Sequence, residues 1–193
     1  MSAIPAFRIG LWNAWILTVL LLAAGTVPLY IDNEKTQKRC EGEPSGSELD
    51  RTTRIAHVIT HLVILPLALI YSVFLPLKLG TLWFFAGLPI YLLGLAMVLV
   101  VSISFATAPL GEPVSKGVYT ISRHPGYFGS FLAYVGIGIA CASWVFLLGA
   151  LVWIIAWHFG VAEEERILVE RYGDAYREYI SRTPRWIGFP RGK

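Results

Sequence analysis

Two polar segments hold the side chains that could do chemistry in an otherwise apolar sequence. The first covers residues 116–129 and contains Arg123, His124 and two tyrosines, and the second is the glutamate run 163–165. His124 precedes Pro125, a residue that suits the first turn of a helix. A helix N-terminus attracts an anionic group, a glutamate accepts hydrogen bonds from hydroxyl or amine groups, and a tyrosine can stack on a flat ring. These residue types together suit a small zwitterionic ligand that carries an adenosine.

A structural interpretation of the same residues stays open beside the ligand interpretation. In the ligand interpretation, the backbone N–H groups of Gly126 and Tyr127 bind an anion at the start of the helix. Glu164 then accepts from a ribose hydroxyl or an amine. In the structural interpretation, Arg123 and Glu164 form an ion pair under the membrane and bind nothing.

The distribution of charged residues predicts the elements that must position these segments. Of the 193 residues, 55% are hydrophobic and only 15% are charged, which is unlike a soluble domain. Four stretches contain no Asp, Glu, Lys or Arg: residues 9–31, 55–77, 79–111 and 124–162. Since about 20 apolar helical residues cross a bilayer, the first three stretches hold one span each and the fourth holds two joined by a tight turn. The sequence predicts an all-α integral membrane protein with five transmembrane helices.

The remaining residues predict how the spans are connected. Residues 32–54 read as a mobile surface loop with a centre rich in Gly, Pro and Ser. From Glu163 the pattern is that of an amphipathic cytosolic helix that Pro184 ends. We expect one domain over residues 1–193, with transmembrane helices one to three in 1–109 and a cofactor-binding core in 110–185.

Proline and small residues predict finer features of the spans. The fourth span should begin near Pro125, and the fifth should run from about 144 to 158. Pro66 and Pro89 permit kinks in the second and third spans. Close helix packing is expected at four small residues of the fourth span: Gly129, Ala133, Gly136 and Gly138.

The basic residues predict the orientation of the chain in the membrane. With the C-terminus placed in the cytoplasm, fourteen of the sixteen Lys and Arg residues lie on the inner side, and only Arg8 and Lys78 lie outside. This arrangement follows the positive-inside rule. We therefore expect the N-terminus outside and both polar segments at the cytoplasmic face. The fourth and fifth spans form a hairpin, so Arg123 and His124 should lie near Glu164.

The sequence predicts neither a metal site nor a disulfide. His57 and His61 share a helix face, but no nearby carboxylate or third histidine completes a metal site, so we predict none. Cys40 and Cys141 lie in different environments, and a disulfide between them is not expected. We expect no nucleic-acid partner and no obligate protein partner.

Four short motifs in a fixed order resemble the signature of the isoprenylcysteine carboxyl methyltransferase family. They are Gly117-Val118-Tyr119, Arg123-His124-Pro125-x-Tyr127-x-Gly129, Glu164-Glu165-x-x-Leu168 and Tyr172-Gly173-x-x-Tyr176-x-x-Tyr179. The similarity covers roughly residues 110 to 185. Each motif is short, but the ordered set with this spacing and topology is fairly specific.

The resemblance implies an integral membrane enzyme that uses S-adenosylmethionine and releases S-adenosylhomocysteine. Family members methylate the carboxylate of a C-terminal prenylated cysteine. The implied catalytic residues are Arg123, which orients the acceptor carboxylate or braces the pocket, and Glu164. The implied cofactor contacts are Val114, Tyr119, His124, Pro125, Gly126, Tyr127, Glu164 and Leu168. Eukaryotic members carry an arginine shortly before the glutamates, where this sequence has residues 158–160, so the residue that contacts the acceptor carboxylate stays open.

The chemistry of this reaction agrees with the residues, but other functions stay open. A carboxylate acceptor is already ionised at neutral pH, so the enzyme needs positioning and exclusion of water more than a base. The partners would be the bilayer and a lipophilic or prenylated acceptor. The alternatives are a phospholipid N-methyltransferase, an NADPH-dependent enzyme similar to sterol reductases, with Arg166 and Arg171 near Glu164, and a membrane scaffold without catalysis.

Overall fold

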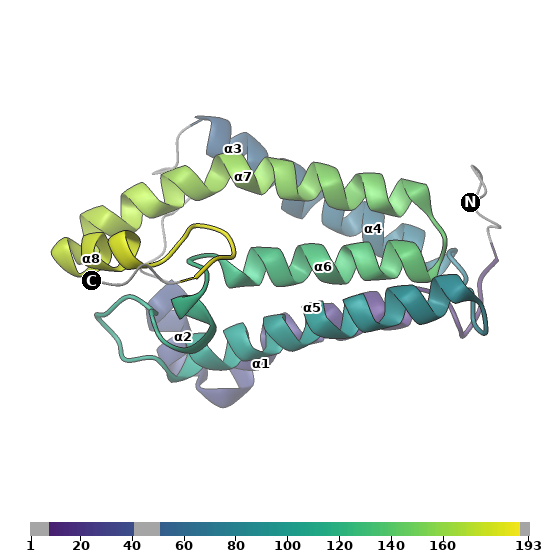
Figure 1. The fold of residues 1–193 in the computed structure, drawn as a ribbon, viewed down its shortest axis with the longest axis horizontal. Helices are drawn as coiled ribbons and strands as arrows, with labels where there is room; N and C mark the ends of the chain where they lie inside the picture. The colour runs from purple at the N-terminus through teal and green to yellow at the C-terminus, as the bar shows by residue number, and fades with distance from the viewer. Residues whose placement is uncertain (1–7, 41–50, 190–193) are drawn as a thin grey trace.

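Long apolar helices run side by side in the computed structural model, which describes residues 8–40 and 51–189 (Figure 1). In chain order the elements are α1 (Trp15–Ile31), α2 (Asn33–Cys40), α3 (Arg51–Val58), the π-helical segment η1 (Ile59–Ile64), α4 (Leu65–Val73), α5 (Leu82–Thr107), the 3-10 turn η2 (Gly117–Thr120), α6 (Pro125–Ala140), α7 (Trp144–Tyr172) and α8 (Asp174–Arg182). Within the described ranges the only β-type pairing is an isolated bridge between Asn13 and Pro76. The all-α prediction is confirmed for this part of the chain.

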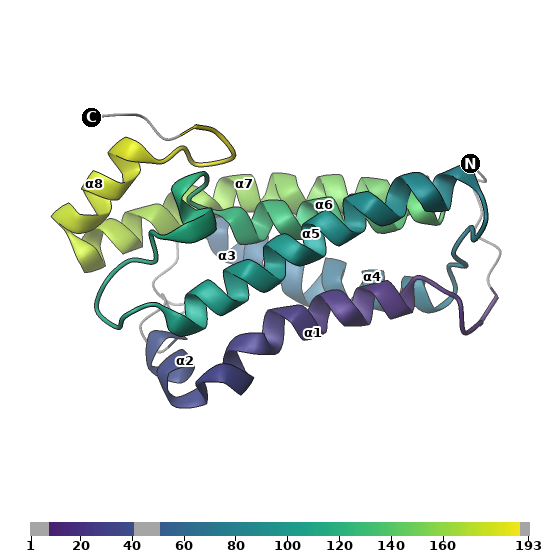
Figure 2. The same cartoon turned by 60° about the horizontal axis from the view of Figure 1, so that its bottom comes forward.

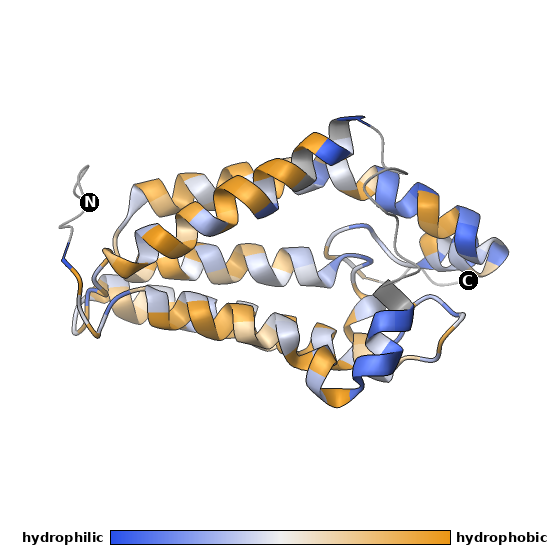
Figure 3. Ribbon diagram, turned by 180° about the vertical axis from the view of Figure 1, so that it is seen from behind, coloured by the Kyte–Doolittle hydropathy of each residue, from blue (hydrophilic) through white to orange (hydrophobic). Residues whose placement is uncertain are grey.

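Three helices of the described chain have the length and composition to cross a bilayer. They are Thr53–Val73, Leu82–Thr107 and Trp144–Tyr172. Helices α1 and α6 are also apolar, but with 17 and 16 residues they are shorter than a typical span of about 20. Hydrophobic residues cover the length of the bundle, and the polar helices α2 and α8 lie together at one end (Figure 3). The structure is therefore that of a membrane protein with a polar end.

Glycines bring α5 and α6 into unusually close contact. A Cβ atom added to Gly94 would lie 2.4 Å from the backbone nitrogen of Ala133, and one on Gly136 would lie 2.3 Å from the nitrogen of Tyr91. Gly87 meets the backbone of Ala140 in the same way. Small residues let two helix backbones approach closely in a membrane, where dispersion contacts replace the hydrophobic effect as the driving force. The predicted packing role of the small residues of α6 is confirmed at Gly129, Ala133, Gly136 and Gly138.

Helix α1 lies along α5 and closes the opposite side of the bundle from α7 (Figure 2). The phenol of Tyr91, which is 1% exposed, donates to the carbonyl oxygen of Leu17 at 2.9 Å. The helix begins at Trp15, whereas the apolar run predicted a start at residue 9. The reason is that Asn13 is held outside the helix, where its side-chain amide donates to the carbonyl of Val73 at 2.7 Å.

Proline explains a break in the second apolar stretch. The backbone N–H of Leu65 donates to Thr60, five residues back, at the end of η1. Pro66 follows in the first turn of α4, where its missing N–H is tolerated. The predicted irregularity at Pro66 takes the form of a π-helical segment, whereas Pro89 lies inside the uninterrupted helix α5.

Two predictions about the connections are corrected. Residues 32–54 were expected as a loop, but Asn33–Cys40 form helix α2. The Gly-, Pro- and Ser-rich centre of that loop lies outside the described residues. A separate amphipathic helix was expected from Glu163, yet α7 continues unbroken to Tyr172 because no residue between Gly160 and Gly173 interrupts it. The break falls at Gly173, whose φ of 56° suits glycine.

Candidate active site

The three consecutive glutamates of α7 point to three different environments. Successive residues of an α-helix are rotated by about 100°. Glu163, whose side chain is 15% exposed, pairs with Arg166 at 2.6 Å. Glu164 accepts a hydrogen bond from the phenol of Tyr127 at 3.0 Å, and Glu165 is only 6% exposed. Three consecutive residues therefore carry a carboxylate that pairs with Arg166, a carboxylate whose side chain is 35% exposed, and a buried carboxylate.

A cavity of about 100 Å³ opens beside Glu164 at the polar end of the bundle. Its walls come from the end of α5, the following connector, η2, the start of α6, α7 and α8. The lining residues are Phe105, Pro113, Val114, Tyr119, Arg123, His124, Glu164, Leu168, Arg171, Tyr172, Tyr176 and Tyr179. A neighbouring cavity of about 280 Å³ is lined by the connector and shares Pro113 and Val114 with the first. The two cavities are therefore adjacent at the polar end of the bundle.

The structure brings most of the sequence-predicted site residues to this one cavity. Six of them line it: Val114, Tyr119, Arg123, His124, Glu164 and Leu168. Tyr127 lies behind Glu164 as its hydrogen-bond donor. Pro125 is fully buried in the first turn of α6, and Gly126 faces Val101, so these two shape the backbone and do not line the cavity.

Tyr127 is held in an aromatic stack. Its ring lies 4.1 Å from the ring of Trp157 with an interplanar angle of 22°, and 5.8 Å from the imidazole of His124 with an angle of 15°. Two rings of the protein therefore stack with Tyr127. Stacking of Tyr127 on a ligand ring stays a prediction, and in the structure its phenol donates to Glu164.

Arg123 pairs with Glu165, and the predicted pair with Glu164 is not formed. The Arg123 Nε donates to Glu165 at 2.9 Å. Its Nη1 donates to the carbonyls of Ile180 and Thr183 at 3.0 and 3.1 Å. The guanidinium is thus used inside the protein, and it braces the wall of the cavity.

Sequence reasoning missed Glu165 and Arg185. The carboxylate of Glu165 also accepts from the Nε2 of His124 at 3.1 Å and from the Nη2 of Arg185 at 2.7 Å. The position of Glu165 could have been predicted, because it follows the buried residues Trp157 and Val161 by eight and four positions and so shares their face. Arg185 carried no such signal, because it lies after α8 in an irregular segment.

Residues 183–188, here called the C-terminal strap, are tied across the start of α6. The N–H of Arg123 donates to Pro184 at 3.0 Å, and the N–H of Gly188 donates to Ile121 at 3.1 Å. From α8, the phenol of Tyr179 donates to the carbonyl of Tyr119 at 2.7 Å. Burial raises the pKa of the Tyr179 phenol, so it stays protonated as a donor.

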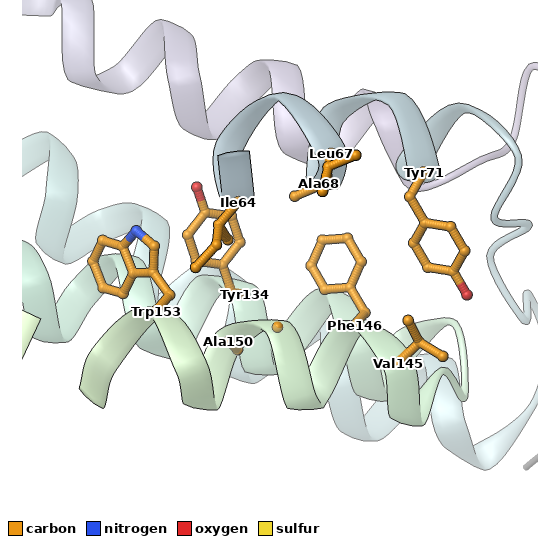
Figure 4. Close-up of a pocket in the computed structure, with 10 residues that line it drawn as sticks. Ile64, Leu67, Ala68, Tyr71, Tyr134, Val145, Phe146, Ala150 and Trp153 are labelled. Carbon is orange, nitrogen blue, oxygen red and sulfur yellow. The ribbon is translucent and has the colours of Figure 1, made fainter. Parts of the chain in front are cut away.

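A third cavity lies in the apolar part of the bundle, away from Glu164. It has a volume of about 340 Å³. Side chains of α4 and α7 face each other across it (Figure 4), with Trp153 at one end and Tyr71 near the other. Trp153 precedes Glu164 by eleven residues, or about 16 Å of helix. This cavity therefore belongs to the apolar part of the bundle and not to the polar site that contains Glu164.

The remaining candidate groups lie outside the site. His61 packs edge-on against Trp157 at 5.6 Å, and the side chain of His57 is outside those described. Over residues 8–40 and 51–189, no group of three or more His, Cys, Asp and Glu side chains could hold a metal ion. Cys141 is buried and carries a free thiol.

Residues 90–175 match the model of the phospholipid methyltransferase family. The chain is also similar to protein-S-isoprenylcysteine O-methyltransferases of several organisms. It is 32% identical over 77 residues to the protein of Schizosaccharomyces pombe, over 38% of this chain and 32% of that protein. It is 32% identical over 82 residues to the Xenopus laevis protein, over 41% of this chain and 28% of that protein. For form B of Arabidopsis thaliana, 79 residues align at 32% identity, over 39% of each chain. The alignments thus span between a quarter and two fifths of these relatives.

Proposed function

We propose that this protein, whose residues 90–175 form a region of the phospholipid methyltransferase type, is a membrane methyltransferase. It uses S-adenosylmethionine and methylates the carboxylate of a lipophilic acceptor such as a C-terminal prenylcysteine. One observation carries the proposal: Tyr119, His124, Glu164 and Leu168, far apart in sequence, meet at one cavity at the polar end of a membrane bundle. Its acceptor class follows the isoprenylcysteine O-methyltransferases that share about 30% identity with it.

The donor set at the cavity fits this cofactor. S-adenosylmethionine, when bound, supplies an electrophilic methyl group on a sulfonium. Glu164 offers a carboxylate that is half-buried, with a side chain 35% exposed, to an ammonium group or a ribose hydroxyl. Leu168 lies one turn further along α7 and offers apolar contact, and the backbone of Tyr119 is held by Tyr179. His124, Pro125, Gly126 and Tyr127 fix the first turn of α6 against this wall.

The proposed reaction requires that the residues at the cavity hold the two reactants in place and exclude water. It does not require a general base. An acceptor carboxylate is ionised at neutral pH, so no side chain has to remove a proton from it. Alignment of the two reactants in a dry site can lower the barrier substantially. The Nε and Nη1 of Arg123 donate to Glu165 and to two carbonyls, so we assign Arg123 to bracing the pocket.

The proposed topology places this site at the cytoplasmic face. Helices α1, η1 with its flanking α3 and α4, α5, α6 and α7 would form five spans in one domain. Residues 110–185 would be the cofactor-binding core, with α8 beyond the bilayer. The clustering of basic residues at the end that carries α2 and α8 supports a cytoplasmic C-terminus and an outer N-terminus.

A second candidate function is N-methylation of a phospholipid, because the matching family is described as phospholipid methyltransferase. An amine acceptor is protonated at neutral pH and must lose a proton before it can attack. This function therefore requires a base that a carboxylate acceptor does not need. Transfer of a radiolabelled methyl group to a prenylcysteine acceptor, with none to phosphatidylethanolamine, favours the first function, and the reverse result favours the second.

The binding step is tested with the glutamates of α7. In purified full-length protein, we expect Glu164→Gln to weaken S-adenosylhomocysteine binding by about 10- to 100-fold, since hydrogen bonds to charged groups are worth about 1.5–3 kcal/mol. Glu163→Gln is the matched control, because Glu163 is the adjacent residue, pairs with Arg166 and does not line the cavity. Isothermal titration calorimetry measures both. Equal affinities of the two variants, or binding of NADPH in place of S-adenosylhomocysteine, would contradict the proposal.

A further inference from the structure

We infer that Glu165 and Arg185 are a positioning pair that orients the His124 imidazole toward the cofactor cavity. The inference rests on the proposed function for its consequence, but its geometry does not depend on it. Neither residue lines the cavity. Arg185 also lies beyond residues 90–175, the region that matches the family.

The carboxylate of Glu165 accepts from three residues, the consecutive Arg123 and His124 ahead of α6 and Arg185 of the strap. Its Oε1 accepts from the Nε of Arg123 at 2.9 Å and from the Nε2 of His124 at 3.1 Å. Its Oε2 accepts from the Nη2 of Arg185 at 2.7 Å, and the Arg185 Nε is 3.2 Å from both oxygens. A buried charge is tolerated when it is paired and hydrogen-bonded in this way. Glu165 can therefore reach a ligand only through another residue.

The partners of Glu165 determine which imidazole nitrogen carries the proton. A carboxylate held by two guanidinium groups is ionised and only accepts hydrogen bonds. The Nε2 of His124 must then carry a hydrogen and donate it to Glu165. In the neutral imidazole the lone pair is on Nδ1, which lies on the side of the cavity, 3.8 Å from the Oε2 of Glu164.

This tautomer gives the cavity two adjacent acceptors, the Nδ1 of His124 and the carboxylate of Glu164. Two acceptors on one wall recognise a group that carries several N–H donors, and an alkylammonium group is the chemical class that fits. In the opposite tautomer Nδ1 would donate and repel such a group. Glu165 thus influences which ligand binds, because it determines the tautomer of His124 without contacting the ligand itself.

Arg185 makes the C-terminal strap a part of this arrangement. Its guanidinium side chain is 36% exposed, yet it reaches the buried carboxylate. The strap continues with Trp186, whose ring lies 6.4 Å from that of His124 and stacks on His158 at 6.0 Å with an angle of 16°. The imidazole is therefore held by Glu165 at its edge, by Tyr127 on a face and by Trp186 at its side. Residues of the strap hold the imidazole in place without touching the ligand.

The test measures the tautomer directly. In full-length protein with ¹⁵N-labelled histidine, two-bond proton–nitrogen spectra distinguish a protonated Nε2 from a protonated Nδ1. We expect the Nε2–H form alone in the parent protein and a mixture of both forms in Glu165→Gln. We expect at least tenfold weaker S-adenosylhomocysteine binding in that variant. An unchanged tautomer would overturn the inference.

A second variant keeps the inference testable if Glu165→Gln does not fold. Arg185→Gln removes one donor from outside the bundle and should shift the His124 signals in the same direction by a smaller amount, whereas Arg185→Lys should restore part of the shift. Arg182→Gln is the matched control, since Arg182 precedes the strap and pairs with Glu178 on the surface. Equal spectra for Arg185→Gln and Arg182→Gln would overturn the inference.

The tautomer is read without any cofactor, so the two proposals can fail separately. If the parent protein binds no S-adenosylhomocysteine but Glu165→Gln still changes the tautomer of His124, the proposed function is contradicted and the positioning pair is supported.

Discussion

At the scale of single residues, the polar site divides its work between two neighbouring glutamates. Glu164 faces the cavity and is available to a ligand, whereas Glu165 faces inward and holds the protein's own cations. Their separation follows from the rotation of about 100° per helical residue. A carboxylate that binds a ligand needs free lone pairs, and one that organises a site needs all of its lone pairs occupied. The site obtains both from consecutive positions.

The phenol of Tyr127 gives a prediction at this scale. Tyr127→Phe removes the hydrogen bond to Glu164 and keeps the ring that stacks on Trp157. We expect folding to be unaffected and S-adenosylhomocysteine affinity to change by about tenfold or less, because one hydrogen bond is lost and Glu164 stays partly solvated. Titration calorimetry and a melting curve in the same detergent check both points. A larger loss than that caused by Glu164→Gln would contradict the assigned role of the phenol.

At the scale of elements, the contact between α5 and α6 sets the position of the site. His124 immediately precedes α6, and Phe105 lies near the end of α5, so both cavity walls depend on how closely these helices approach. The approach is limited by glycine, because a methyl group at Gly94 would fall within 2.5 Å of two backbone atoms of α6. Backbone atoms cannot move aside as side chains do. The glycines are therefore a requirement of the fold.

Gly94→Ala tests this contact. We expect it to destabilise the protein by about 1–3 kcal/mol or more through overpacking, with a lower melting temperature. Because α6 must then shift, we also expect weaker S-adenosylhomocysteine binding. Gly25→Ala is the control, since Gly25 lies in α1 with no atom within 4 Å of an added Cβ. Equal melting temperatures for the two variants would show that the close contact is absent in the membrane.

At the scale of the whole molecule, the site lies at the polar end of an apolar bundle. The helices α2 and α8 and the strap lie at the same end of an apolar bundle (Figures 1 and 3). A water-soluble cofactor would enter at that end, while an acceptor with a long hydrocarbon chain would remain in the bilayer. Under the proposed function, the fold would bring a polar and an apolar reactant to one place from two phases.

Cysteine labelling tests the proposed orientation. Asp174 begins α8, and its side chain is 98% exposed. The carbonyl of Arg8 accepts from Asn13 just ahead of α1, and α1 begins at the end of the bundle opposite α8 (Figure 2). In a protein without its two native cysteines, we expect Arg8→Cys to react with a membrane-impermeant maleimide in intact cells. Asp174→Cys should react only after the membrane is opened. The reverse pattern of labelling would place the cavity at the outer face.

The sequence by itself determined those features of the fold that depend on neighbouring residues. Proline at position 125 was sufficient to predict the start of α6, and the small residues of α6 predicted its close packing. Apolar length predicted membrane helices, and the order of the motifs predicted that Tyr119, His124 and Glu164 meet. Each of these features depends on composition or on short spacing, which a sequence displays directly.

Only the tertiary structure decided which partner each charged group takes. Arg123 had Glu164 and Glu165 as neighbouring choices, and a difference of one residue on a helix turns the side chain from the cavity to the interior. Arg185 lies twenty residues after Glu165, and Gly173 and the whole of α8 lie between them. No local sequence pattern could therefore predict their contact. Pairing between distant segments depends on how complete helices pack, and packing is a property of surfaces that exist only after the chain has folded.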